Sequence, residues 1–187
     1  IMELSDRNRN MAVIFGDGAG AAVVERATEG SESRILSTHI HSDGTQAEEL
    51  MTKNPSSGSE TRFTPEMIEN GDLLPYMNGP LVFKTAVVKF PEVIQEALDF
   101  NNMTKEDIDL LIPHQANLRI ASFVQKRLEL PDEKVYNNIQ KYGNTTAASI
   151  PIAMSEAVSI GKLKEGDLLC VAAFGSGFTW ASALIRW

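Results

Sequence analysis

Apolar and polar residues follow two different periods along this chain, and the periods divide it into expected strands and helices. Continuous or alternating apolar runs predict β-strands at 11–15, 34–44, 109–113 and 168–174. Apolar positions three and four residues apart predict helices at 81–100, 119–129 and 146–160. Because strands alternate with helices and the chain ends in a strand pair, we expect an α/β fold whose mixed sheet has helices on both faces.

Three local signals refine these elements. Residues 44–76 are rich in Ser, Asn, Gly and Pro and keep no period, so we expect a long loop or an insertion there. Pro91 lies inside the helical pattern 81–100 and predicts a kink or a break, since proline cannot donate the helical hydrogen bond. Thr104 followed by Asp107 predicts a capped helical turn before the next strand.

The pattern Phe-Gly-x-Gly occurs twice, at 15–18 and at 174–177, each time between a strand-like run and a second apolar run. We expect a hairpin at both places, and two hairpins with the same hinge predict an internal duplication. The first, which reads GDGAGA, also fits the anion-binding loop of a phosphate-binding domain. Against that alternative, no P-loop lysine follows, and a strand comes next where a phosphate site prefers the N-terminus of a helix.

Composition and charge narrow the class of protein. With 187 residues, 43% of them hydrophobic, the chain can form one globular domain or part of a larger one. No stretch approaches the roughly 20 apolar residues of a membrane span, and the start resembles no signal peptide, so we expect a cytoplasmic protein without a membrane partner. The net charge of −8 argues against nucleic acid as a partner.

Cys170 is the only cysteine, and it lies in an apolar, strand-like run. A single cysteine excludes an internal disulfide, and a thiol in such surroundings is normally inert packing, so we interpret Cys170 as structural. His39 and His41 form a His-x-His pair, but no third ligand is evident and we expect no metal site. The chain opens at Ile1 and soon enters an expected strand, which is typical of the later part of a longer protein.

The candidate chemistry starts at His114, which follows the apolar run LLIP and so lies at the carboxyl end of a strand. A lone histidine there is more often structural than catalytic. Asn144, however, lies in another loop directly before a helix, and the turn of Gly175, Ser176 and Gly177 can present a backbone N–H. Three such donors facing one cleft would stabilise an oxyanion. The structural alternatives are a helix cap for Asn144 and a plain hairpin for the glycine turn.

Five motifs in order give a more specific signal: FGDGAGAAVV, PYMNGPLVFKTAV, LIPHQANLRI, YGNTTAASIPIA and AAFGSGFTWASALIRW. Together they resemble the β-ketoacyl-acyl carrier protein synthase III family, which has the thiolase-like fold. The resemblance implies a duplicated α/β fold in five layers and a homodimer. It divides this chain into the last strand pair of the N-terminal half at 1–30 and the C-terminal half at 31–187.

The activity implied by the resemblance is a decarboxylating Claisen condensation that initiates fatty acid synthesis, by an acyltransferase. Its substrates are an acyl-CoA primer and malonyl-acyl carrier protein, with no further cofactor. By the resemblance, His114 and Asn144 bond the malonyl thioester carbonyl as CO₂ leaves. The backbone N–H of Ser176 forms a second oxyanion hole that faces the acyl-enzyme, and Phe174 walls the site.

The resemblance also assigns residues around the cavity entrance. Phe83, Ala116 and Asn117 match positions that line the tunnel for CoA or phosphopantetheine. Arg119 and Lys126, which share one face of the helix 119–129, match a basic patch that docks the acidic carrier protein. For Lys126 alone, an ordinary solvated helix face is the competing interpretation.

The chain also departs from the family pattern. Pro80 stands where relatives carry a polar residue, and the segment 52–72 that lines the acyl pocket is longer here, which leaves primer length open. The nucleophilic cysteine belongs to the other half, and Cys170 does not match its motif. We therefore expect this chain alone to be incomplete as an enzyme and to need the N-terminal half as a partner. A non-catalytic half that serves only docking or dimerisation is the alternative.

Overall fold

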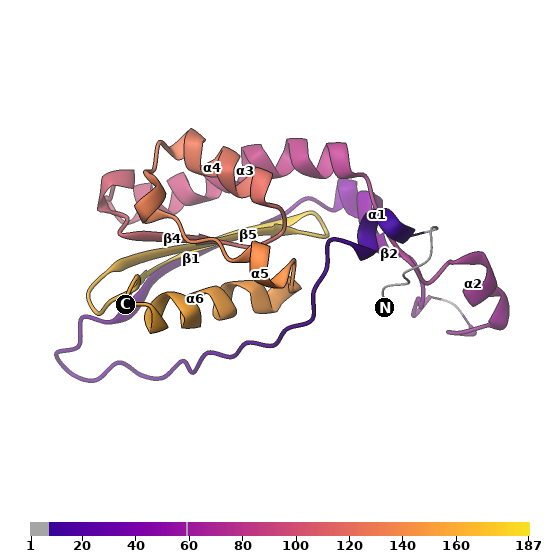
Figure 1. Cartoon of the computed structure of the whole chain (residues 1–187), viewed down its shortest axis with the longest axis horizontal. Helices are drawn as coiled ribbons and strands as arrows, with labels where there is room; N and C mark the ends of the chain where they lie inside the picture. Colours follow the sequence, from indigo (N-terminus) through magenta and orange to yellow (C-terminus); the bar gives the residue numbers. More distant parts are fainter. Residues whose placement is uncertain (1–7, 59) are drawn as a thin grey trace.

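The computed structural model describes residues 8–58 and 60–187, which are built around a four-stranded mixed sheet (Figure 1). The strands lie in the order β1-β6-β5-β4, with β4 parallel to β5 and the other pairs antiparallel. Their bounds are Arg34–Ser42 for β1, Leu110–Pro113 for β4, Leu168–Gly175 for β5 and Thr179–Arg186 for β6.

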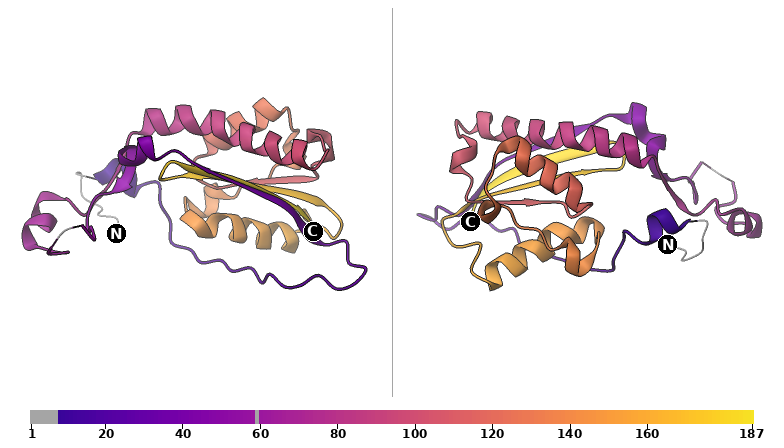
Figure 2. Two further views of the ribbon diagram at one scale, coloured as in Figure 1. Left: turned by 180° about the vertical axis from the view of Figure 1, so that it is seen from behind. Right: turned by 45° about the horizontal axis from the view of Figure 1, so that its top comes forward.

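Helices cover both faces of this sheet, as the sequence predicts (Figures 1 and 2). Two of them, α3 (Gly79–Phe100) and α4 (Leu118–Leu128), lie on one face, and α6 (Ser149–Ser159) lies on the other. A short helix α5 (Ile139–Tyr142) and the 3₁₀ turns η3 (Lys105–Asp107), η4 (Asp132–Lys134) and η5 (Thr146–Ala148) join these elements. The turn η3 begins with the expected capping box of Thr104 and Asp107.

The core forms because the edge strand β4 is apolar and buried on both of its faces. Successive side chains of a strand point to opposite sides, so Leu110 and Ile112 pack with α6 while Leu111 packs with α3 and α4. All of these side chains are almost fully buried. Burial of one such side chain contributes about 2 kcal/mol, so both layers hold the strand that leads to His114.

The helix α4 confirms the predicted amphipathic pattern. Its apolar arc is buried and comprises Ile120, Ala121, Val124 and Leu128. The side-chain Oδ1 of Asn117 caps the helix by accepting the backbone N–H of Arg119 at 2.9 Å. The polar arc with Arg119 and Lys126 faces outward.

Two predicted features of local structure are not found: a break at Pro91 and one long loop at 44–76. The helix α3 continues unbroken through Pro91, because its buried face, with Phe90, Val93 and Ile94, holds the turn that lacks one hydrogen bond. Residues 44–76 do not form one long loop. They contain short elements that no period reveals: η2 (Gly44–Glu49), β2 (Leu50–Thr52), α2 (Pro65–Asn70) and β3 (Pro75–Met77), with β2 paired to β3.

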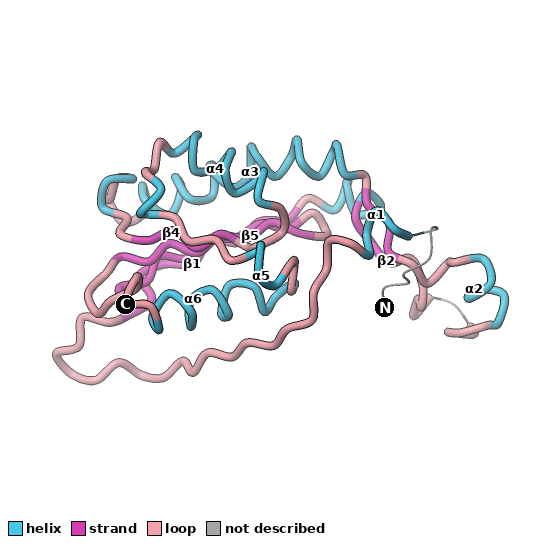
Figure 3. Tube along the Cα trace, viewed as in Figure 1, coloured by secondary structure: helices cyan, strands magenta, loops and turns pink. Residues whose placement is uncertain are grey.

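The expected first strand and hairpin are also absent from the part of the chain that the structure describes. A short helix α1 (Arg9–Ala12) occupies the start of the segment, and Phe15 makes only an isolated bridge to Asn144. Residues 16–33 then run as a loop beside α6 (Figures 1 to 3). A strand needs a neighbouring strand for its backbone hydrogen bonds, and these residues pair with none. The GDGAGA stretch therefore lies in an irregular segment and not in the turn of a hairpin.

No helix within 8–58 and 60–187 combines the length and apolar character that a membrane span requires.

Candidate functional site

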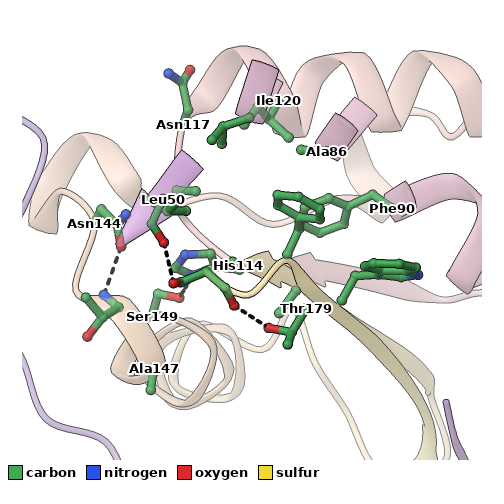
Figure 4. Close-up of a pocket in the computed structure, with 18 of the residues that line it drawn as sticks. Leu50, Ala86, Phe90, His114, Asn117, Ile120, Asn144, Ala147, Ser149 and Thr179 are labelled. Carbon is green, nitrogen blue, oxygen red and sulfur yellow. Dashed lines mark hydrogen bonds between the residues drawn. The ribbon is translucent and has the colours of Figure 1, made fainter. Parts of the chain in front are cut away.

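A cavity of about 700 Å³ opens at the carboxyl ends of β4 and β5 (Figure 4). Apolar side chains from α3 and the sheet form most of its wall, among them Val82, Phe90 and Trp180. His114, Asn144 and Ser149 gather at one end, away from Ala86 and Phe90 (Figure 4). The cavity is therefore apolar with one polar end, the usual form of a site that binds an organic ligand.

His114 is held at the end of β4 by two contacts. Its backbone N–H donates to the carbonyl of Ala172 at 2.8 Å, which continues the parallel ladder with β5. Its Nδ1 lies 2.6 Å from the hydroxyl oxygen of Ser149, at the start of α6. The backbone N–H of Gln115 also donates to this oxygen, at 3.3 Å, and leaves the hydroxyl hydrogen free for Nδ1. When the hydroxyl is the donor to Nδ1, the imidazole proton lies on Nε2.

Burial lowers the pKa of His114 to about 4, because the interior disfavours the charged imidazolium. The N-terminus of α6 lies beside the ring and carries partial positive charge, which acts in the same direction. At neutral pH His114 is therefore an uncharged imidazole. It can donate one hydrogen bond from Nε2 but is a poor source of a full proton.

Asn144 is buried and fixed through both its backbone and its side chain. Its backbone N–H donates to Ile14 O at 2.9 Å, and its carbonyl accepts the N–H of Gly16 at 3.0 Å. The side-chain Oδ1 accepts the N–H of Thr146 at 2.9 Å. Thr146 has φ +53°, a strained conformation for a β-branched residue. With Oδ1 occupied, the amide group has its NH₂ left for a ligand.

The turn between β5 and β6 forms a further part of the wall. Phe174, Gly175 and Ser176 line the cavity, whereas Gly177 shapes the turn with φ +136°. The hydroxyl of Ser176 donates to Leu50 O, and its carbonyl accepts the hydroxyl of Thr179 at 2.8 Å. The hairpin predicted at 174–177 is confirmed.

The residues assigned to the entrance divide into two groups. Phe83, Ala116 and Asn117 line the cavity. Arg119 lies outside the lining, with its guanidinium carbon 5.7 Å from the centre of the Phe83 ring, and Lys126 lies farther along the exposed face of α4. The structure thus brings the predicted tunnel residues together and leaves Lys126 apart from them.

Sequence reasoning missed Gln115, Thr146 and Ser149. The side chain of Gln115 donates to Pro113 O at 2.6 Å and accepts the N–H groups of Asn138 and Ile139 at 3.0 and 3.2 Å. It thereby ties the end of β4 to the start of α5. Gln115 stands next to His114, which was its only signal. Ser149 carried none, because its contact with His114 joins residues 35 positions apart.

Two further residue groups do not line the cavity. Cys170 is completely buried and its burial raises the pKa of the thiol to about 12, which confirms the structural interpretation. His39 and His41 both contact the carboxylate of Glu96, at 3.3 and 2.6 Å. Across the described ranges, no three His, Cys, Asp or Glu side chains are arranged to hold a metal ion.

Comparison with protein families agrees with this architecture. The family model described as 3-oxoacyl-[acyl-carrier-protein (ACP)] synthase III matches residues 1–44, and its C-terminal counterpart matches residues 98–187. The β-ketoacyl-[acyl-carrier-protein] synthase III of Caldanaerobacter subterraneus is 46% identical over 97% of this chain, and that of Clostridioides difficile is 47% identical over 96%.

Solved structures give the same result. The crystal structure of β-ketoacyl-[acyl carrier protein] synthase III from Thermus thermophilus covers 100% of this chain with a TM-score of 0.86 and 42% identity. That from Aquifex aeolicus covers 96% with a TM-score of 0.82. This chain spans 55% of the first structure, 52% of the second and 54% of the Caldanaerobacter relative, about half the length in each case. The thiolase-like fold is confirmed, and the chain belongs to the 3-oxoacyl-[acyl-carrier-protein] synthase III family.

Proposed function

We propose that this chain supplies the decarboxylation site of a condensing enzyme that joins an acyl-CoA primer to malonyl-acyl carrier protein and so initiates fatty acid synthesis. One observation carries the proposal. The Nδ1 of His114 faces the Ser149 hydroxyl, the Oδ1 of Asn144 accepts the Thr146 N–H, and both residues line one end of the same cavity. The pair therefore offers N–H groups to a ligand oxygen.

Such a pair suits a reaction in which negative charge develops on a carbonyl oxygen. When the bond between the malonyl Cα and its carboxylate breaks, CO₂ leaves and the electron pair moves into the thioester as an enolate. Hydrogen bonds from His114 and Asn144 stabilise the enolate oxygen, and one such donor lowers the activation free energy by about 3 kcal/mol. The neutral state of His114 leaves the enolate unprotonated and so able to attack.

The enolate carbon then attacks the carbonyl of an acyl-cysteine thioester. A carbon–carbon bond forms, the thiolate leaves and the β-ketoacyl product remains on the carrier protein. The backbone N–H of Ser176 is our candidate donor to the oxyanion of this second step, with Phe174 beside it. The nucleophile must be a cysteine other than Cys170, since that thiol is buried and protonated at neutral pH.

The proposal extends to partners. Phe83, Ala116 and Asn117 would contact the phosphopantetheine arm of the substrates, and Arg119 with Lys126 would attract the acidic carrier protein. No cofactor besides the substrates is required. We also propose a homodimer in the cytoplasm, with residues 1–30 belonging to the N-terminal half of the duplicated fold.

The test uses an enzyme completed by the N-terminal part of the Caldanaerobacter relative, fused to this chain. In that enzyme, His114→Ala should lower malonyl decarboxylation by about 10²-fold to 10³-fold, while acetyl transfer to the cysteine stays near its original rate. Radiolabelled malonyl and acetyl groups follow the two half-reactions separately. Equal loss of both would contradict the role of His114, and a completed enzyme with no decarboxylation at all would favour the docking or dimerisation alternative.

Lys126→Ala is the matched control on the exposed face of α4. It should raise KM for the carrier protein without changing kcat, because a peripheral charge acts on the encounter between the proteins. An unchanged KM would assign Lys126 to an ordinary solvated face.

A further inference from the structure

Three aromatic rings form a row across the sheet, from its edge to the cavity. In the strand register, His41 of β1 lies opposite Trp180 of β6, and Trp180 lies opposite Phe174 of β5. The rings of His41 and Trp180 are stacked with centroids 5.7 Å apart and an interplanar angle of 23°. Those of Trp180 and Phe174 are 6.5 Å apart at 22°. Directly opposed residues of neighbouring strands are the pairs that interact most strongly in a sheet.

The outer end of the row is fixed by charged groups of α3. The Nε2 of His41 lies 2.6 Å from Glu96 Oε2, and the other oxygen of Glu96 contacts His39 Nδ1 at 3.3 Å. The hydrogen bond from His41 is the main cause that lowers the pKa of Glu96. The ammonium of Lys89 lies 5.3 Å from the centre of the Trp180 ring. Trp180 is thus held by a stacked ring and by a cation on a packed helix.

The inner end of the row belongs to the proposed site. Phe174 and Trp180 both line the cavity, and Phe174 packs on Phe178 with ring centroids 5.1 Å apart. Phe174 directly precedes the cavity-lining turn with Ser176. Two positions before Phe174, the carbonyl of Ala172 accepts the backbone N–H of His114. A shift of the Trp180 ring would therefore change the apolar wall beside the polar end.

We propose that His41 and Glu96 are positioning residues that act through Trp180 on Phe174, and that this row determines which acyl groups the cavity accepts. Glu96 orients the imidazole, and the imidazole ring holds the indole against Phe174. The row reaches no reacting atom. The part of the proposal that concerns acyl groups rests on the proposed function, whereas the part that concerns the packing of Trp180 does not.

The packing is tested on this chain with Trp187→Phe, which leaves Trp180 as the single tryptophan. Three substitutions of His41 separate ring from hydrogen bond: His41→Phe keeps a ring, His41→Gln keeps a donor and His41→Ala keeps neither. Near-ultraviolet circular dichroism and acrylamide quenching of Trp180 are measured. We expect His41→Phe to stay near the parent protein, and His41→Ala and His41→Gln to lose the dichroic signal and become more readily quenched.

Unchanged Trp180 spectra in His41→Ala would overturn the proposal. So would parent-like spectra in His41→Gln together with altered spectra in His41→Phe, because the hydrogen bond and not the ring would then hold the indole. Thr38→Ala is the control, because Thr38 lies on the same strand, is exposed and points to the opposite face from His39 and His41. Its spectra should match those of the parent.

The effect on acyl groups is measured in the completed enzyme as the ratio of kcat/KM for acetyl-CoA and for butyryl-CoA. Loosening one apolar wall changes discrimination between chain lengths by about ten-fold, so His41→Ala should shift the ratio by that amount and His41→Phe should restore it. A disturbed Trp180 spectrum with an unchanged ratio would overturn the specificity role. Absence of any condensation in the completed enzyme would instead refute the proposed function, while the spectra still decide the packing.

Discussion

The two Phe-Gly-x-Gly segments have the same pattern and opposite structures. Residues 174–177 form the tight turn of the β5–β6 hairpin, whereas residues 15–18 are extended and pair only through the single bridge of Phe15 with Asn144. Val23 and Val24, which follow the first segment, are 91% and 77% exposed, so the apolar run that predicts a second strand is unpaired. The Phe-Gly-x-Gly pattern therefore permits a hairpin but does not impose one.

The glycines act differently in the two segments. Gly177 has φ +136°, a conformation that side chains rarely adopt. Gly16 instead permits close contact, because a Cβ there would lie 1.9 Å from the carbonyl oxygen of Tyr142. A Cβ at Gly18 would meet the side chains of Ile152 and Thr145, and one at Gly20 would meet the ring of Pro151. One segment uses glycine for backbone conformation and the other for space.

Both segments nevertheless support the same site. Phe15 and Phe174 line one cavity. Backbone hydrogen bonds beside each segment hold one of the two candidate donors, Asn144 or His114. The first segment holds Asn144 through Ile14 and Gly16, while β5 holds His114 through Ala172.

The largest effect is expected for Gly16→Ala. The added Cβ meets backbone atoms that cannot rotate away, so the free energy of unfolding should fall by about 3 kcal/mol or more. The matched control is Gly175→Ala in the other segment, where a Cβ meets nothing within 4 Å. Urea denaturation of both variants measures the difference, and equal losses would show that close packing does not distinguish the segments.

His114 should make the free energy of unfolding depend on pH, whereas Asn144 should not. Because the pKa of His114 is about 4 when folded and 6.5 in the unfolded reference, the unfolded chain binds more protons between these values. Stability should therefore fall as the pH falls from 6.5 to 4, by about 3 kcal/mol in total.

The measurement is urea denaturation at several pH values for the parent, His114→Gln and Asn144→Ala. The slope in this window should flatten in His114→Gln and persist in Asn144→Ala, since an amide does not titrate. Equal slopes in the parent and in His114→Gln would show that His114 does not cause this pH dependence.

Gly177→Ala should cost about 2 kcal/mol, because alanine is strained at φ +136° and its Cβ would lie 2.7 Å from Thr179 Cγ2. Gly18→Ala should cost less, about 1 kcal/mol, since its Cβ meets only side chains of Ile152 and Thr145, which can adjust. Thermal unfolding compares the two. A larger loss for Gly18→Ala would reverse the roles assigned to the glycines.

A small change in stability, about 1–2 kcal/mol, is expected for Ser149→Ala, because the contacts of the hydroxyl with His114 Nδ1 and with the Gln115 N–H are both lost. Its informative readout is the ¹⁵N spectrum of His114, which should change from one Nε2–H tautomer to a mixture. Only three histidines are present, so loss of the signal in His114→Gln assigns it. A single unchanged tautomer in Ser149→Ala would mean that the hydroxyl does not orient the ring.

Elements with long, clear periods were predictable. The strands β1, β4, β5 and β6, the helix α4 and the α/β class follow from apolar spacing that local packing preserves. Elements that depend on distant partners were not. Helix α3 survives Pro91 because of its buried face, and the strand expected at 11–15 fails for want of a neighbouring strand. Of the site residues, the chemical types were readable, but their hydrogen-bond partners were not.

The sequence by itself determined the family, the α/β fold class and the two candidate donors His114 and Asn144, because ordered motifs and residue chemistry are local properties of a chain. Only the tertiary structure decided that Ser149 orients the imidazole, that Thr146 orients the amide and that His41, Trp180 and Phe174 form one row. Each of these contacts joins separate elements or depends on a strained backbone. Their geometry follows from strand register and helix packing, which no short stretch of sequence contains.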